Sequence, residues 1–285
     1  MNKIALGRYV PYKTLLHRLD PRSKLLMLVL LMVAVFYSYQ TYTMTFLMGG
    51  ILLLFIVTLL LIAKIRLRQL FSSLKALWMM VIILLFINVL IPPLNASNIA
   101  FKIGNFAIYY ESIFQSLKII LRLVLMIALT LILTATTKPL DLTYALEWYM
   151  SPLKIIQFPA HEIAMTVSIA LRFIPTLLDE TMRIMKAQAS RGVDFERGKL
   201  KEKIKALLSL IVPLFMSAFL RSEELANAME ARGYNPRGKR TKYRQLKWQM
   251  SDTFSLVLIT LVTAFVIVTS SLNWNFIEMI MSLVS

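Results

Sequence analysis

A run of 20 residues from Met44 to Ala63 contains no charged side chain, and this run constrains the fold more than any other feature. An α-helix of about 20 residues, rising 1.5 Å per residue, spans the roughly 30 Å hydrocarbon core of a bilayer. Inside a bilayer every backbone polar group must be bonded internally, so such a run favours a helix. The chain is 58% hydrophobic with a mean hydropathy of +0.68, which is too apolar for an ordinary soluble domain. The sequence therefore predicts an all-α, polytopic membrane protein.

About five stretches are expected to cross the membrane. They are Leu25–Tyr39, Met44–Ala63, Leu77–Ile91, Ile113–Thr136 and Thr253–Ser271. Residues 1–24 and the loop that carries Lys64, Arg66, Arg68 and Lys75 are basic, so the positive-inside rule places them in the cytoplasm. Residues 92–112 carry only Lys102 and Glu111 and fit the outer side. An odd number of crossings from a cytoplasmic N-terminus then leaves the C-terminus outside.

Lys118 and Arg122 lie four residues apart, on one face of the fourth stretch. A cation at membrane depth is costly and by default indicates function. Alternatively, residues 106–122 form an amphipathic piece at the membrane interface and Leu123–Thr136 makes the crossing. We favour this second interpretation.

The character of the chain changes after Lys138, and we expect three parts. These are 1–137, a membrane part with about four transmembrane helices; 138–248, a cytoplasmic helical coupling module; and 249–285, a last transmembrane helix. Residues 140–247 contain no long uncharged run, and Pro175 is expected to kink or break the helical pattern over 160–190. Residues 183–247 hold 16 of the 32 Lys and Arg but six of the 15 Asp and Glu, a net charge of +10. Retention on the cytoplasmic side explains this excess better than a nucleic-acid partner, because no recognisable binding module accompanies the charge.

Two amphipathic helices in this module end in matching signatures, 41 residues apart. The signatures are Ser190-Arg191-Gly192 and Ala231-Arg232-Gly233. The apolar stripes are Leu178, Met182 and Met185 on the first helix and Phe215, Leu225 and Met229 on the second. Glycine supplies the left-handed residue that ends a helix, and the helix dipole favours a cation in the last turn. Each signature alone is explained by helix capping, but two in one basic region indicate a paired docking device. We expect the stripes to be buried against other helices or partner subunits.

Catalytic motifs are incomplete. His161-Glu162 resembles the start of a zinc-protease motif, but Met165 occupies the position of the second ligand. The segment from Gly233 to Lys239 has the spacing of a phosphate-binding loop, yet Arg240 stands where Ser or Thr would hold magnesium. The chain has no cysteine, which excludes thiolate metal sites and disulfides. We therefore expect no enzymatic activity, no metal and no cofactor.

Four segments together resemble the transmembrane T component of energy-coupling factor transporters. They read LDLTYALEWYMSPL (140–153), HEIAMTVSIALRFIPTLLDE (161–180), KAQASRG (186–192) and VPLFMSAFLRSEELANAMEARGY (212–234). The N-terminal LHRLDPRSKLL (15–25) also fits, and the first signature departs from the family pattern only by serine in place of alanine.

This family is one of bacterial ATP-binding-cassette importers of vitamins and transition-metal ions. The resemblance implies that each signature arginine docks on one of two ABC ATPase subunits, which hydrolyse ATP, and that the T component links them to a substrate-binding S component. It also implies a multi-pass protein of the bacterial cell membrane. The S component would select the substrate, so this chain does not identify it.

Two other function classes remain as alternatives. A stand-alone secondary transporter would usually carry ionisable residues or broken helices at mid-membrane, for which Lys118 and Arg122 are the candidates. A membrane-embedded enzyme would need clustered His, Asp or Glu, whereas Asp141, Glu147, His161 and Glu162 show no ligand spacing. Co-purification with ATPase subunits distinguishes a coupling subunit from both.

Overall fold

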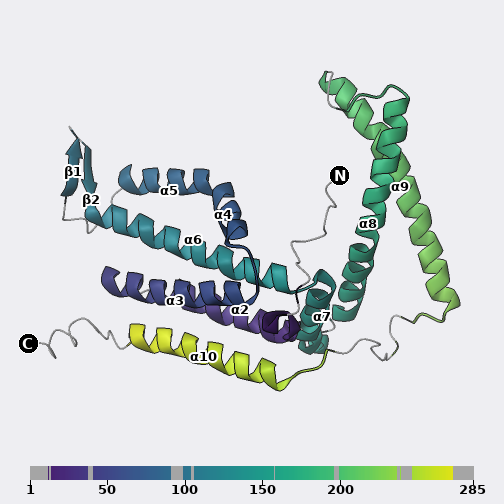
Figure 1. The fold of residues 1–285 in the computed structure, drawn as a ribbon. Coiled ribbons are helices and arrows are strands. Elements are labelled where there is room, and N and C mark those ends of the chain that lie inside the picture. Colours follow the sequence, from purple (N-terminus) through teal and green to yellow (C-terminus); the bar gives the residue numbers. More distant parts are fainter. Residues whose placement is uncertain are drawn as a thin grey trace, which may run out of the picture. The chain divides into compact units, whose positions relative to one another are not determined.

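The structure is a computed structural model, shown in Figure 1, and it is built almost entirely of helices. It describes residues 12, 14–37, 41–90, 99–103, 106–156, 158–195, 199–235, 238 and 246–271. The elements are α1 (Leu15–Arg18), α2 (Pro21–Phe36), α3 (Tyr42–Ile62), α4 (Leu67–Ala76), α5 (Trp78–Leu90), β1 (Ile99–Ile103), β2 (Phe106–Tyr109), α6 (Tyr110–Thr136), α7 (Pro139–Met150), the 3₁₀ helix η1 (Ser151–Ile156), α8 (Ala160–Ser190), α9 (Leu200–Ala231) and α10 (Met250–Ser271). The all-α class predicted from the sequence is confirmed.

The chain divides into two compact units. Unit 1 combines Met1–Leu142 with Leu246–Ser285, and unit 2 is Thr143–Gln245. The last long helix, α10, therefore packs with the first ones, although more than 200 residues separate them in the sequence.

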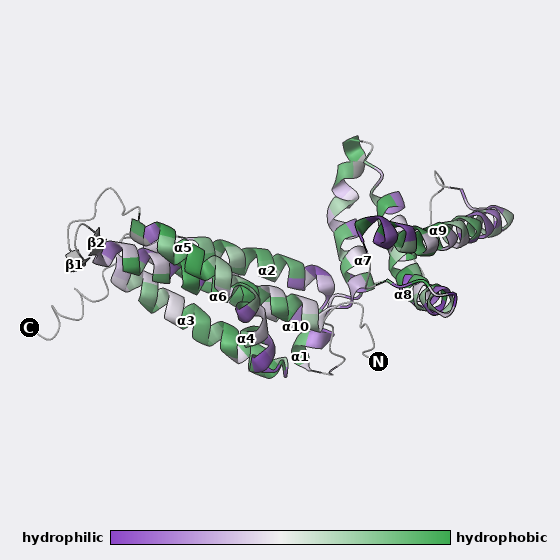
Figure 2. Cartoon of the chain, turned by 90° about the horizontal axis from the view of Figure 1, so that it is seen from above, coloured by the Kyte–Doolittle hydropathy of each residue, from purple (hydrophilic) through white to green (hydrophobic). Residues whose placement is uncertain are grey.

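Unit 1 is a bundle of long helices. Within it α2 packs against α6 and α10, while α3 and α5 pack against α6. Its centre is aliphatic and includes the buried side chains of Leu31, Ile56, Leu60 and Leu125. Large apolar side chains also cover much of the outside of α3, α5 and α10, and Figure 2 shows hydrophobic residues along most of the length of these helices. A helix that is apolar on all sides is typical of a membrane span.

The set of candidate membrane helices differs from the expected one. Five described helices, α3, α6, α8, α9 and α10, are long and apolar enough to cross a membrane, and α4 with α5 forms a further pair bent by 56°. The number agrees with the predicted five, but α8 and α9 take the places given to residues 25–39 and 77–91. One reason is that α2 has only 16 residues, about 24 Å of helix. The other is that the charges of α8 and α9 are spread over 31 and 32 residues.

Two local expectations for unit 1 are wrong. The predicted basic loop is largely helical, because residues 67–76 form α4, which turns the buried Leu70 towards the bundle. Residues 110–136 form one continuous helix of 27 residues rather than an interfacial piece followed by a separate crossing. Contacts with α2, α3, α4 and α5 hold this helix along its length and outweigh the polar residues in its first half.

A short hairpin precedes α6. Strands β1 and β2 are antiparallel, and Phe101 lies opposite Ile108 and Ile103 opposite Phe106. Aromatic and β-branched residues favour strands, and here they pair across the hairpin. The sequence analysis did not predict this hairpin, which lies at the end of the bundle opposite α1 (Figure 2).

Unit 2 consists mainly of two long helices. Neither Pro175 in α8 nor Pro213 in α9 ends its helix, so the expected break at Pro175 is wrong. An interior proline removes one backbone hydrogen bond. In α8 this loss is tolerated because other elements, η1 and α9, contact the helix.

Candidate functional site

The two signatures adopt the same backbone geometry. In the first, the Gly192 amide donates to Ala189 O at 3.0 Å and the Val193 amide donates to Gln188 O at 3.1 Å. In the second, the Gly233 amide donates to Glu230 O at 2.8 Å and the Tyr234 amide donates to Met229 O at 3.0 Å. This pair of bonds defines the Schellman helix ending. The predicted left-handed glycines are confirmed, with φ of 85° at Gly192 and 71° at Gly233.

Both arginines occupy the C-cap position and project into solvent. Arg191 has φ −88° and ψ 7°, and Arg232 has φ −88° and ψ 11°. Both side chains are exposed, and neither forms an ion pair or a side-chain hydrogen bond within the described ranges. The neighbouring Ser190 and Ala231 are small and exposed as well. Each helix therefore ends in a slender tip with one free guanidinium, which carries five planar donors.

Side-chain contacts hold α8 and α9 antiparallel. The carboxylate of Glu180 accepts from Ser217 Oγ at 2.5 Å and from Arg221 Nη2 at 3.2 Å. One helical stretch further on, Gln188 Nε2 donates to Ser209 O at 3.4 Å. These three pairs fix which turns of the two helices face each other.

The antiparallel register places the two tips at opposite ends of the helix pair, as Figure 1 shows. Arg191 follows Gln188 by one turn, so it lies near residue 206 of α9, whereas Arg232 ends that helix. The intervening stretch of α9 corresponds to about 39 Å at 1.5 Å per residue.

The predicted apolar stripes are only partly covered within this chain. Leu178, Met185, Leu225 and Met229 are half-buried. By contrast, 40% of Met182 and 66% of Phe215 remain exposed. Packing between α8 and α9 therefore does not bury the whole stripe, and apolar surface is left for a membrane or a partner.

A link between α7 and α8 escaped the sequence analysis. Nδ1 of His161 lies 3.1 Å from Oε1 of Glu147, whose side chain is buried. This contact joins the start of α8 to α7 and gives both residues a structural position. The signal was present as two polar residues 14 apart, but only folding across η1 brings them together.

Arg122 also has a structural position. Its Nη2 atom donates to Phe36 O at 3.2 Å and to Tyr37 O at 3.3 Å, the carbonyls at the C-terminal end of α2. A cation at this end of a helix also interacts favourably with the helix dipole. Lys118 lies one turn earlier on α6 and is half-buried. Arg122 therefore compensates unpaired carbonyls, a role that sequence spacing did not reveal.

A buried polar cluster joins the first and last parts of unit 1. Asp252 is fully buried, and its carboxylate accepts from the Asp20 amide at 2.7 Å, the Gln249 amide at 2.7 Å and Ser23 Oγ at 3.2 Å. Beside it, Lys24 Nζ donates to Thr136 O at 3.0 Å. The bonds tie the N-terminal ends of α2 and α10 to each other, and Lys24 adds the C-terminal end of α6. The sequence analysis singled out none of these residues.

The segment with phosphate-loop spacing is described only in part. Gly233 ends α9, and Gly238 lies close to Asn235, whose carbonyl accepts from its amide at 3.2 Å. Lys239 and Arg240 lie outside the described residues. No group of three potential metal-ligating side chains occurs in the described part of the chain.

Comparisons with known proteins cover both units. The CbiQ family model, described as cobalt transport protein, matches residues 12–243. Energy-coupling factor transporter transmembrane protein EcfT of Macrococcus caseolyticus is 42% identical over 269 residues, 94% of this chain and 98% of the relative. EcfT of Bacillus subtilis is 42% identical over 266 residues, 93% and 97% of the two chains. EcfT of Lactococcus lactis subsp. cremoris is 39% identical over 275 residues, 96% and 100% of the two chains.

Proposed function

The chain belongs to the EcfT family of transmembrane components of energy-coupling factor transporters, and we propose that it couples two ABC ATPase subunits to a substrate-binding S component. In this role the chain is a multi-pass membrane protein that neither hydrolyses ATP nor selects the substrate. The import of vitamins or similar micronutrients would follow from the S component with which it assembles.

The single observation that carries this proposal is the pair of matching tips with free arginines. Each guanidinium extends from a Schellman ending that has no bulky neighbour, so a partner groove can enclose it. A planar guanidinium donates several hydrogen bonds to carboxylates and carbonyls, and arginine is enriched among the residues that dominate interface energies. We assign Arg191 and Arg232, with Ser190, Gly192, Ala231 and Gly233, to ATPase docking.

The separation of the tips supports two ATPase contacts rather than one. About 39 Å of helix lies between the arginines, which exceeds the roughly 30 Å diameter of a small domain. The bonds of Glu180 to Ser217 and Arg221 hold the helix pair together between the tips. A movement of the ATPases would therefore be passed on as a rigid-body rotation of α8 and α9.

We assign contact with the S component to the apolar surface of the same helices. Met182 on α8 and Phe215, Phe219 and Leu220 on α9 are exposed large apolar side chains. Exposed apolar patches of this kind mark protein or membrane contacts. The partly covered stripe of Leu178, Met185, Leu225 and Met229 continues into this surface.

The orientation follows from charge. We propose that the N-terminus and residues 138–248 face the cytoplasm, because basic segments are retained on that side, and that the β1–β2 hairpin faces outwards. The ATPases are then on the same side as the arginines.

The test replaces both arginines and measures co-purification with the ATPase subunits. If the arginines are buried anchors, each Arg→Ala change should weaken ATPase association by about 2 kcal/mol or more, roughly thirtyfold, and the double variant should abolish it. Membrane insertion of the chain should be unaffected.

The matched controls are Arg183→Ala on α8 and Lys203→Ala on α9, whose side chains are also exposed. Solvated charges contribute about 0–1 kcal/mol, so both controls should retain the ATPases. Equal tolerance of alanine at all four positions would leave only helix capping and would refute the docking role.

A further inference from the structure

A groove runs between α3 and α10 in unit 1. The helix α10 packs against α2, and α3 packs against α6, but α3 and α10 do not pack closely on each other. Between them lies a hollow of about 660 Å³, within the range of about 300–1,000 Å³ that is usual for ligand sites. A second hollow of about 280 Å³ continues along the same two helices and shares Phe55 and Leu258 with the first. We call the two hollows together the α3–α10 groove.

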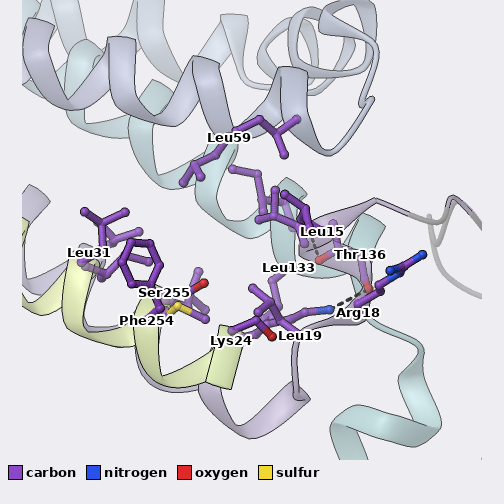
Figure 3. Close-up of a pocket in the computed structure, with 18 of the residues that line it drawn as sticks. Leu15, Arg18, Leu19, Lys24, Leu31, Leu59, Leu133, Thr136, Phe254 and Ser255 are labelled. Atoms are coloured by element: carbon purple, nitrogen blue, oxygen red, sulfur yellow. Dashed lines mark hydrogen bonds between the residues drawn. The ribbon is translucent and has the colours of Figure 1, made fainter. Parts of the chain in front are cut away.

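The wall of the groove is apolar over nearly its whole length. In the larger hollow Leu31 of α2, Leu59 of α3 and Phe254 of α10 face the space between the helices (Figure 3). Its lining extends along α10 from Ser251 to Ile259, about 12 Å of helix. This length is close to one leaflet, which is half of the roughly 30 Å hydrocarbon core.

One end of the larger hollow is cationic. Arg18 and Lys24 lie at the end opposite Leu31 and Phe254, as Figure 3 shows. Lys24 is buried and donates to the carbonyls of Thr136 at 3.0 Å and His17 at 3.5 Å. Arg18 is exposed and forms no ion pair within the described residues. An unpaired guanidinium is therefore available at the mouth of an apolar groove.

We propose that the α3–α10 groove binds an anionic phospholipid, with its phosphate at Arg18 and one acyl chain along Phe55, Phe254 and Leu258. The combination of an apolar channel of leaflet depth with a free cation at one end matches the two parts of such a lipid. Anionic lipids favour basic side chains at the membrane surface. The proposal requires only that unit 1 spans a bilayer and does not depend on ATPase docking.

A partner helix fits the groove less well. A helix about 10 Å across and 12 Å long occupies about 900 Å³, more than the 660 Å³ of the larger hollow. An acyl chain is narrower and bends with the groove, so it enters without moving α3 away from α10.

The test uses the absence of native cysteine. The full chain, purified with the subunits that accompany it, carries a fluorescent label at Ser255→Cys inside the groove. It is reconstituted with phosphatidylglycerol or phosphatidylcholine whose acyl chains carry a quencher. The matched control is Val257→Cys, two residues along α10, where the side chain is 49% exposed and lines neither hollow.

At Ser255 we expect half-maximal quenching at about a fivefold lower fraction of phosphatidylglycerol than of phosphatidylcholine, the preference typical of one basic side chain near anionic headgroups. At Val257 the two lipids should quench alike, as ordinary boundary lipids do. Arg18→Gln should remove the preference at Ser255 and leave Val257 unchanged. Equal quenching by both lipids at Ser255 in the unsubstituted groove would overturn the proposal. So would protection of Ser255 from both lipids, because a protein segment would then cover the groove.

Discussion

Three residues at helix ends show how the same backbone geometry carries different side chains. Gly192 and Gly233 close the Schellman endings of α8 and α9, and Lys64 occupies the equivalent position at the end of α3. The Lys64 amide donates to Leu61 O at 3.0 Å and the Ile65 amide donates to Leu60 O at 3.1 Å. Lys64 has φ 56°, a left-handed conformation that costs a residue with a Cβ atom about 1–2 kcal/mol. Burial of Leu60 and Ile65 around this ending holds the conformation in place.

At the residue scale we predict that Lys64→Gly stabilises the protein by about 1 kcal/mol, because glycine adopts the left-handed conformation without steric cost. Thermal unfolding of the purified protein in detergent measures the change. Lys64→Ala removes the same charge but keeps the Cβ atom, so it should give no such gain. If alanine stabilises as much as glycine, charge rather than backbone strain is the cause.

Helix packing in unit 1 depends on a close approach between α3 and α6. Gly49 is buried at this contact, and a Cβ atom built on it would overlap the side chain of Leu121. A Cβ atom on the adjacent Gly50 would meet nothing within 4 Å. Small residues allow helix backbones to approach in membranes, so Gly49 is part of the interface and Gly50 is not.

At the element scale we predict that Gly49→Leu destabilises the protein by about 1–3 kcal/mol through overpacking, whereas Gly50→Leu stays within about 0.5 kcal/mol of the parent. Unfolding in detergent compares the two variants. Adding Leu121→Ala to Gly49→Leu should recover part of the loss, because it removes the side chain that clashes. Equal effects at Gly49 and Gly50 would show that the α3–α6 contact does not exclude a larger side chain.

The whole chain is closed by contacts between its two ends. Asp252 at the start of α10 accepts from the amide of Asp20, 232 residues away, in a site with no solvent exposure. This bond makes α10 part of the N-terminal bundle and leaves Thr143–Gln245 as a separate unit. A protein divided in this way has a membrane body in unit 1 and a pair of long helices in unit 2 that can carry partner contacts.

At the scale of the whole molecule we predict that the β1–β2 hairpin faces outwards and the α9 tip faces the cytoplasm. Single cysteines at the exposed Tyr110 and Asn227 test this, because the native chain has none. A membrane-impermeant maleimide added to intact cells should label Tyr110→Cys and spare Asn227→Cys, and both should react after the membrane is opened. The reverse pattern would invert the topology.

The sequence by itself determined the features that depend on local spacing and composition. Uncharged runs such as Met44–Ala63 specify apolar helices because the bilayer leaves no other way to satisfy the backbone. The two Arg-Gly signatures specify their own helix endings, because the left-handed turn and the C-cap involve residues that are close in the chain. The fold class, the family and both signature sites were therefore predictable.

Only the tertiary structure decided the features that depend on distant residues or on competition between local preferences. Pro175 favours a break, but contacts of α8 with η1 and α9 keep the helix continuous. Arg122 finds its acceptors at the end of α2, and Asp252 finds Asp20, across separations that no spacing rule connects. The groove between α3 and α10 exists because each helix packs on a different neighbour. Packing partners, buried polar bonds and grooves depend on the arrangement of all helices at once, which local sequence does not encode.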